Sequence, residues 1–259
     1  KSDVEYVQDK GTLVVGITDF EPMDYKNDKD EWIGFDADMA KAFAKSLGVD
    51  AEFVEIDWDN KVMELDGKTI DCVWNGMTLI DEVKSSMECT DAYMNNAQVV
   101  VVPADKADKY QDEESVKDLT FAVEAGSAGE AEVSALGLNY TPVSSQADAL
   151  MEVASKSSDA AVIDSLMAGA MIGEGTGYAD LTYTIGLNSE ARCSIYSLNH
   201  FRGLPNGGPN GNFAKLMTRH SRRVMMVDGF SSAYAQFSWA GMWVWGLPES
   251  TSFDHSAEP

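Results

Sequence analysis

The feature that most limits the folds open to this chain is a regular alternation of short apolar runs with helical patterns. Residues 12–17 form a β-branched apolar run that ends in turn-forming residues, which is typical of a buried strand. Phe35, Met39 and Phe43 then recur at helical spacing, and Gly48 can end that helix. The alternation continues with strands expected at 51–56 and 70–74 and a helix around 62–65. Strands that alternate with helices pair in parallel, so we predict an α/β fold with parallel-rich sheets.

A second series of strands and helices begins near residue 98. A valine-rich run at 98–102 precedes Pro103 and a charged stretch, which predicts a strand that leaves one lobe for another. It is followed by strands at 119–123 and 160–164, by a helix that opens at 126–130 and by another helix at 147–154. Two such series in 259 residues exceed what one small core usually holds, so we expect two lobes.

The acidic balance of the chain argues against two classes of partner. Lysine and arginine number 19 against 43 aspartate and glutamate, and the resulting charge of −24 repels nucleic-acid phosphates and anionic lipid heads. We therefore expect no nucleic-acid partner. The acidic residues form either a solvated surface or a field that steers a cationic ligand. No run of 18 apolar residues occurs, so no segment is expected to span a bilayer.

The cysteine and histidine residues do not point to a metal or hydrolase site. Cys72, Cys89 and Cys193 form no CxxC pair and have no histidine at ligand spacing, so we expect no zinc. Cys72 and Cys89 either pair in an oxidising compartment or remain buried thiols. The three histidines lie in the last sixty residues and no serine stands in a GxSxG motif, so we expect neither a catalytic triad nor a cofactor.

Several residues that follow strands of the first series are candidates for a ligand site. The carboxyl ends of parallel strands meet at one edge of a sheet, so the loops after residues 17, 56 and 74 should converge on one cleft. Phe20 and Trp58 follow the first two strands and either pack on an apolar or cationic ligand or belong to the core. Asn75 and Gly76 open the third loop, in which Thr78 offers a hydroxyl group.

Two candidates follow strands of the second series. Ser127 and Ala128 lie in a run of small residues at a helix start, where free backbone N–H groups can hold a small anion such as a carboxylate. The alternative is an ordinary helix cap. Asp164 ends an apolar strand, so its carboxylate either pairs with an ammonium group or caps the next helix.

The order of these motifs resembles a known family, the extracytoplasmic solute-binding proteins of polar amino-acid ABC transporters, known as solute-binding protein family 3. The resemblance covers residues 11 to about 190 and is specific only when the motifs are taken together. The motifs are GTLVVG at 11–16, FEPMDY at 20–25, GFDADMA at 34–40, GKTID at 67–71, NGMT at 75–78, DAYM at 91–94, GSAGE at 126–130 and DAAVID at 159–164.

The resemblance implies a two-lobed, type II periplasmic-binding fold with a two-strand hinge. The first lobe would comprise residues 1–101 and the return segment 187–259, with residues 102–186 inserted as the second lobe. The two crossings would lie near 99–103 and 183–189. Such a protein is not an enzyme: it closes as a monomer on a free amino acid and delivers it to a membrane permease. It acts in the periplasm or on the cell surface as a lipoprotein, after loss of a signal peptide.

The resemblance also assigns roles to the candidate residues. Phe20 and Trp58 would sandwich the ligand side chain, and Asp164 would take the α-amine. Asn75, Gly76 and Thr78 would line the first-lobe side. Ser127 and Ala128 would offer their amides to the α-carboxylate.

Two alternatives on the same scaffold remain open. One is an enzyme that resembles cyclohexadienyl dehydratases, in which Glu130 or Asp164 acts as a general acid. The other is a ligand sensor that serves no transporter.

Two parts of the chain depart from the family pattern. Val83 occupies the position of an arginine that grips the α-carboxylate, and Ala97 stands where relatives often carry a basic residue. The ligand is therefore either a standard α-amino acid held in another way or a different amine-bearing solute. The tail from 191 onward matches loosely. Apolar spacing in it predicts helices at 213–227 and 230–239, followed by tryptophans that would plug the core or meet a partner.

Overall fold

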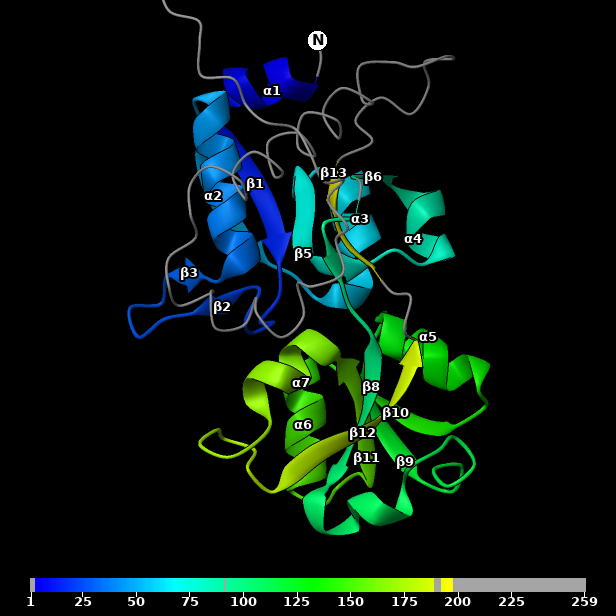
Figure 1. The fold of residues 1–259 in the computed structure, drawn as a ribbon. Helices are drawn as coiled ribbons and strands as arrows, with labels where there is room; N and C mark the ends of the chain where they lie inside the picture. The colour runs from blue at the N-terminus through cyan, green and yellow to red at the C-terminus, as the bar shows by residue number, and fades with distance from the viewer. Residues whose placement is uncertain (1–2, 91, 189–191, 198–259) are drawn as a thin grey trace, which may run out of the picture.

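A computed structural model describes residues 3–90, 92–188 and 192–197 and shows two lobes, each built on its own sheet (Figure 1). The first lobe contains a six-stranded sheet and the second a five-stranded sheet. The predicted α/β fold with parallel-rich sheets is confirmed, since parallel pairs join β1 to β4 and β5, and β9 to β10 and β11. Within the described residues no helix combines the length and hydrophobicity that a bilayer crossing requires.

The first lobe is built from residues before 96 together with one later strand. Its sheet has the order β4-β1-β5-β13-β6, with β7 paired to β13, and β13 runs antiparallel to β5. Its helical elements are α1 (Asp3–Lys10), α2 (Phe35–Leu47), the 3-10 turn η1 (Trp58–Asn60), α3 (Lys61–Asp66) and α4 (Asp81–Ser86). Its strands are β1 (Thr12–Ile17), β2 (Tyr25–Lys26), β3 (Trp32–Ile33), β4 (Asp50–Glu55), β5 (Cys72–Thr78), β6 (Glu88–Cys89), β7 (Met94–Asn95) and β13 (Arg192–Ser197).

The core of the first lobe forms where α2 covers β1 and β5. Leu13 and Ile17 of β1 are fully buried in the same cluster as Phe43 of α2. The ring of Phe43 lies 5.9 Å from that of Trp74 in β5. Gly48 ends α2 in the left-handed conformation at φ 77°, which glycine adopts without steric cost. The helix and the terminating glycine that the sequence predicts are both confirmed.

The second lobe is a contiguous segment with the sheet order β10-β9-β11-β8-β12. Strands β11 and β12 both run antiparallel to β8. Its elements are β8 (Gln98–Pro103), the 3-10 turn η2 (Ala104–Lys109), β9 (Thr120–Glu124), α5 (Ala128–Ala135), β10 (Asn139–Val143), α6 (Gln146–Ala154), β11 (Ala160–Asp164), α7 (Ser165–Met171) and β12 (Leu181–Asn188).

The chain passes between the lobes slightly earlier than the sequence suggested. From Gln98 onward β8 is hydrogen-bonded to β11 and β12, because its valines are buried between these two neighbours. The expected crossing at 99–103 thus lies inside the second sheet, and the outward passage falls at Asn96 and Ala97. On the return, 181–188 form β12, and Ser189 lies outside the described residues.

The interpretation of Asn75 and Gly76 as a loop after the third strand is wrong. Strand β5 continues through Thr78 because β13 pairs with its final residues, with Cys193 opposite Thr78. Gly76 has φ 59° and lies where the pairing register with β13 shifts, so a glycine signals an irregularity within the strand here. Strand β5 therefore carries both residues directly to the border between the lobes.

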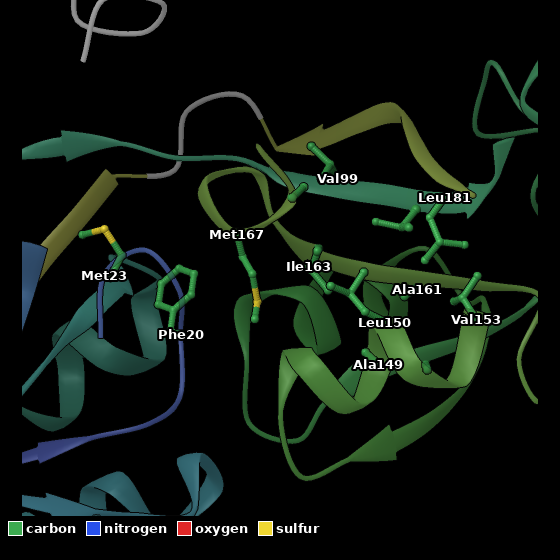
Figure 2. Close-up of a cluster of buried hydrophobic side chains, with 13 residues drawn as sticks. Phe20, Met23, Val99, Ala149, Leu150, Val153, Ala161, Ile163, Met167 and Leu181 are labelled. Carbon is green, nitrogen blue, oxygen red and sulfur yellow. The ribbon is translucent and has the colours of Figure 1, made fainter. Parts of the chain in front are cut away.

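An apolar cluster spans that border. Phe20 and Met23 of the first lobe share a buried cluster with Val99, Ile163 and Met167 of the second. Figure 2 shows Met167 between the two first-lobe side chains and the remainder of the second-lobe core. The lobes are therefore packed against each other.

Two further expectations concern the cysteines and the tail. Cys72 and Cys89 are free thiols, with Cys72 buried, so the suggested disulfide is absent. The helices expected at 213–227 and 230–239 and the tryptophans after them lie outside the described residues.

Candidate functional site between the lobes

One cavity at the border of the lobes brings together all eight residues that the sequence predicted to bind the ligand. It holds about 380 Å³ of empty space, part of it open to solvent. The eight predicted residues that line it are Phe20, Trp58, Asn75, Gly76, Thr78, Ser127, Ala128 and Asp164. Seven other residues complete its wall: Lys61, Met77, Ile80, Val83, Glu124, Gly126 and Gln146.

Two aromatic side chains form the apolar part of the wall. Phe20 is 3% exposed and also belongs to the apolar cluster across the border, so its core and cavity interpretations are both correct. Trp58 stands in η1, packed with Ile56 and Val73, and its ring lies 4.8 Å from Lys61 Nζ. One ring of the cavity thus already has a cation against it.

The polar residues of β5 hold the first-lobe wall in shape. The Asn75 side chain accepts from the Thr18 backbone N–H at 2.8 Å and donates to Thr18 Oγ1 at 2.7 Å. A Cβ atom on Gly76 would lie 3.0 Å from Phe20 Cε1, so glycine leaves room for that ring. The Thr78 side chain is buried beside the cavity.

The start of α5 is a capped helix terminus that faces the cavity. Ser127 Oγ accepts from the Glu130 N–H at 3.1 Å, and Glu130 Oε2 accepts from the Gly126 N–H at 2.7 Å. The pair resembles a capping box, except that Glu130 accepts from the N–H of the residue before the N-cap Ser127. Glu130, considered above as a general acid, is therefore part of the cap and is not among the lining residues.

The interpretation of Asp164 as a helix cap is wrong. It precedes α7 but makes no side-chain cap bond. Its carboxylate instead accepts amide hydrogens from Asn96, from Gln98 at 2.9 Å and from Gln146 at 2.5 Å. Burial raises the pKa of Asp164 to about 6, against the opposing effect of the Gln146 and Gln98 hydrogen bonds.

Glu124, at the end of β9, is a second buried carboxylate that sequence reasoning missed. It is 4% exposed, and burial, followed by the negative charge of Asp164, raises its pKa to about 8. Gln146 donates to Asp164 at 2.5 Å, and its side chain also acts to lower the pKa of Glu124, against the effect of burial. Among the side chains that the structure describes, which do not include Arg192, no lysine or arginine nitrogen lies within 4.0 Å of either carboxylate.

Lys61, the first residue of α3, is the other important side chain that the sequence did not reveal. It is 7% exposed, and its Nζ donates to the carbonyl oxygens of Trp58 at 3.1 Å and Gly126 at 2.8 Å. Burial lowers the pKa of Lys61, and the nearby negative charge of Glu124 opposes that shift. In the part of the chain that the structure describes, no carboxylate forms an ion pair with it.

Val83, where the resemblance implied an arginine, is apolar. Val83 is 3% exposed and lines the cavity. Its neighbour Lys84 is exposed and pairs with Asp81 at 3.6 Å, so it does not supply the missing charge.

Across the described ranges, no group of three or more histidine, cysteine or acidic side chains is arranged to hold a metal ion.

Comparison with known proteins agrees with this architecture. Residues 13–222 match the family described as bacterial extracellular solute-binding proteins, family 3. The arginine-binding extracellular protein ArtP from Bacillus subtilis (strain 168) is 30% identical over 164 residues. That match covers 61% of this chain and 63% of ArtP, so the chain spans less than two thirds of that relative's length.

Solved structures give a longer match. An arginine-bound glycine-to-alanine variant of ArgBP from T. maritima aligns with a TM-score of 0.76 at 27% identity, covering 85% of this chain and 99% of that one. The ancestral amino acid-binding protein AncCDT-1, a precursor of cyclohexadienyl dehydratase, aligns with a TM-score of 0.78 at 26% identity, over 91% and 99% of the two chains. With its two-lobed α/β fold of the type II periplasmic binding proteins, this chain belongs to the family 3 bacterial extracellular solute-binding proteins.

Proposed function

We propose that this protein binds a free amino acid between its lobes, outside the cytoplasm, and delivers it to the permease of an ABC transporter. The observation that carries the proposal is that one cavity holds both a buried cation and buried acids. Lys61 supplies the cation, and Glu124 and Asp164 supply carboxyl groups that form no ion pair with any lysine or arginine side chain that the structure describes. An amino-acid zwitterion complements both.

The energetic argument rests on the cost of burying charge. A buried charge without a counterion is unfavourable unless it is hydrogen-bonded or it changes protonation state. The raised pKa values of Glu124 and Asp164 express this cost. A ligand ammonium group offsets it through charge-assisted hydrogen bonds. Asp164, already oriented by three amides, is our choice for the α-amine.

The remaining predicted residues fit the rest of such a ligand. Phe20 and Trp58 offer apolar surface to its side chain, while Asn75, Gly76 and Thr78 shape the first-lobe wall. The amides of Ser127 and Ala128 stand at the start of α5, where a carboxylate is favoured.

The cavity residues belong to both lobes, which supports binding by hinge closure. The first lobe contributes Trp58 and Asn75 and the second contributes Ser127 and Asp164, so the full set of contacts exists only when the lobes meet. A ligand that needs both sets shifts the population toward the closed form. The chain would act as a monomer, in the periplasm or anchored at the cell surface, as the family's extracellular character supports.

A screen of the full chain tests this proposal. Thermal unfolding would be followed with each amino acid, polyamines, quaternary amines and prephenate, and hits would be measured by calorimetry. A ligand that binds only the folded state at 100 times its Kd adds about 2.7 kcal/mol to stability. We expect a hit among the amino acids, with a smaller radius of gyration by X-ray scattering when it is bound. A cooperative melt with no hit would contradict binding, and turnover of prephenate would favour the dehydratase alternative.

A further inference from the structure

We propose that Lys61 binds the carboxylate of the ligand and that it reaches this position only when the lobes are closed. This inference rests on the function proposed above and assigns it a specificity-determining residue. It is carried by three observations: the partners of the ammonium group, its place between the lobes, and the charges elsewhere in the cavity.

The Lys61 ammonium group is buried and has only uncharged acceptors among the described residues. Its Nζ donates to the carbonyl oxygens of Trp58 and Gly126, at 3.1 Å and 2.8 Å. An ammonium group has three N–H donors, so these bonds leave one for a ligand in the cavity that Lys61 lines. Carbonyl oxygens hold the group in place without cancelling its charge, and an anion is its natural third partner.

The second observation is that Lys61 bridges the lobes. Lys61 begins α3 in the first lobe, whereas Gly126 directly precedes the Ser127 cap of α5 in the second. The two backbones approach closely at this point, since a Cβ atom on Gly126 would lie only 2.8 Å from Asp59 Cα. Opening the lobes would break the Nζ–O bond and withdraw the cation from the start of α5. Carboxylate binding and closure therefore depend on the same side chain.

The third observation is that the described part of the cavity wall offers a carboxylate no other cation. Among the lining residues whose side chains the structure describes, Lys61 is the only lysine or arginine. The ionised carboxylate of Asp164 repels an anion, and Glu124, whose pKa burial raises to about 8, offers it no positive charge. Val83 is apolar, and Lys84 points to solvent and pairs with Asp81. Lys61 is thus the described lining side chain that attracts a ligand carboxylate.

A double-mutant cycle between the protein and the ligand tests the contact. Calorimetry on the full chain would compare L-arginine with L-argininamide and L-histidine with L-histidinamide, since each amide keeps the α-amine and the side chain and loses the carboxylate charge. We expect the wild type to prefer the acid by about 30-fold or more, as for a buried charge pair. In Lys61→Met, which keeps the apolar stem, the preference should fall below about threefold. Lys84→Met is the matched control and should retain it.

The outcomes separate the inference from the function on which it rests. If Lys61→Met weakens the acid and the amide equally, or leaves the preference intact, Lys61 is not the carboxylate partner, although the chain still binds amino acids. If the wild type binds none of these probes and nothing in the amino-acid screen, the proposed function fails. Lys61→Arg, which keeps the charge, should retain most of the preference, and a cooperative urea transition would show that each variant folds.

Discussion

The hydrogen bonds of Asp164 stabilise its ionised form and leave its charge without a cationic partner among the described side chains. Its oxygens accept hydrogens from Asn96, Gln98 and Gln146, none of which carries a charge. Amides orient a carboxylate and stabilise its ionised form without neutralising it. Negative charge consequently remains at the cavity wall for a ligand to meet.

Replacing Asp164 should therefore weaken binding more than it weakens the fold. We expect Asp164→Asn to lower the affinity for an amino-acid ligand by about 30-fold or more, because the ligand ammonium loses a buried charged partner. Titration calorimetry would measure this change. Asp180→Asn, at an exposed position of the same lobe, is the control and should bind as the wild type does. Unchanged affinity in Asp164→Asn would mean that the ammonium pairs elsewhere, with Glu124 as the next choice.

Single residues also show what the sequence could and could not reveal about the site. Phe20, Trp58 and Asp164 could be named because they follow strands whose ends meet at one edge. Glu124 carries the same signal, an acid that ends an apolar strand, and could have been named with them. Lys61 could not, because a lysine in the first turn of a helix is ordinary and its significance depends on Gly126 in the other lobe.

At the scale of elements, α5 and α6 begin in the same way and make a matched pair. Ser127 and Ser145 each accept a hydrogen bond from the N–H three residues on, at 3.1 Å and 3.0 Å. Only Ser127 lines the cavity. We expect Ser127→Ala and Ser145→Ala each to lower the free energy of unfolding by about 1 kcal/mol in urea titrations. Only Ser127→Ala should also weaken ligand binding, and a similar loss in Ser145→Ala would reduce the effect to general destabilisation.

Two glycines that flank α5 test how closely the lobes must approach. Gly126 and Gly137 have φ of 70° and 67°, so alanine is strained at both. A Cβ atom on Gly126 would meet Asp59 across the border, whereas nothing lies within 4 Å of one on Gly137. We expect Gly126→Ala to reduce affinity at least about tenfold and to enlarge the ligand-bound molecule in X-ray scattering. Gly137→Ala should lose stability but bind normally; equal binding by both would mean that the lobes need not close this far.

The sequence predicts the bounds of some strands better than those of others. Strands β1, β8 and β11 are apolar runs bounded by turn residues, so local pattern was sufficient. Strand β5 extends to Thr78, beyond the predicted end at residue 74, because its last residues pair with β13. That partner lies more than a hundred residues away in the chain. A glycine in such a strand looks like a turn until the partner is known.

For the whole molecule, buried acids decide how stability depends on pH. Burial raises the pKa of Asp36 to about 7 and that of Glu124 to about 8, above the value of about 4 for unfolded acids. Between pH 4 and the raised pKa values, Asp36 and Glu124 stay protonated in the folded chain but are ionised in the unfolded chain. The free energy of unfolding should therefore fall as pH rises from about 4 to about 8 and then level off.

Urea titrations from pH 5 to pH 9 would measure that fall. Glu124→Gln cannot ionise, so its stability should decline less steeply than that of the wild type. Glu174→Gln, at an exposed site, should follow the wild type. An equal slope in all three proteins would show that Glu124 contributes nothing to the pH dependence.

The order of strands in the first sheet has a consequence for how the polypeptide matures during synthesis. Strand β13 is the last described strand, yet it lies between β5 and β6. The second lobe is complete once residue 188 has been made, whereas β5, buried at all seven positions, still lacks a neighbour and presents an aggregation-prone edge. The lobe that begins later is thus expected to fold earlier. Amide exchange on a chain stopped at residue 188 should find protection in β8 to β12 and little in β1 and β5.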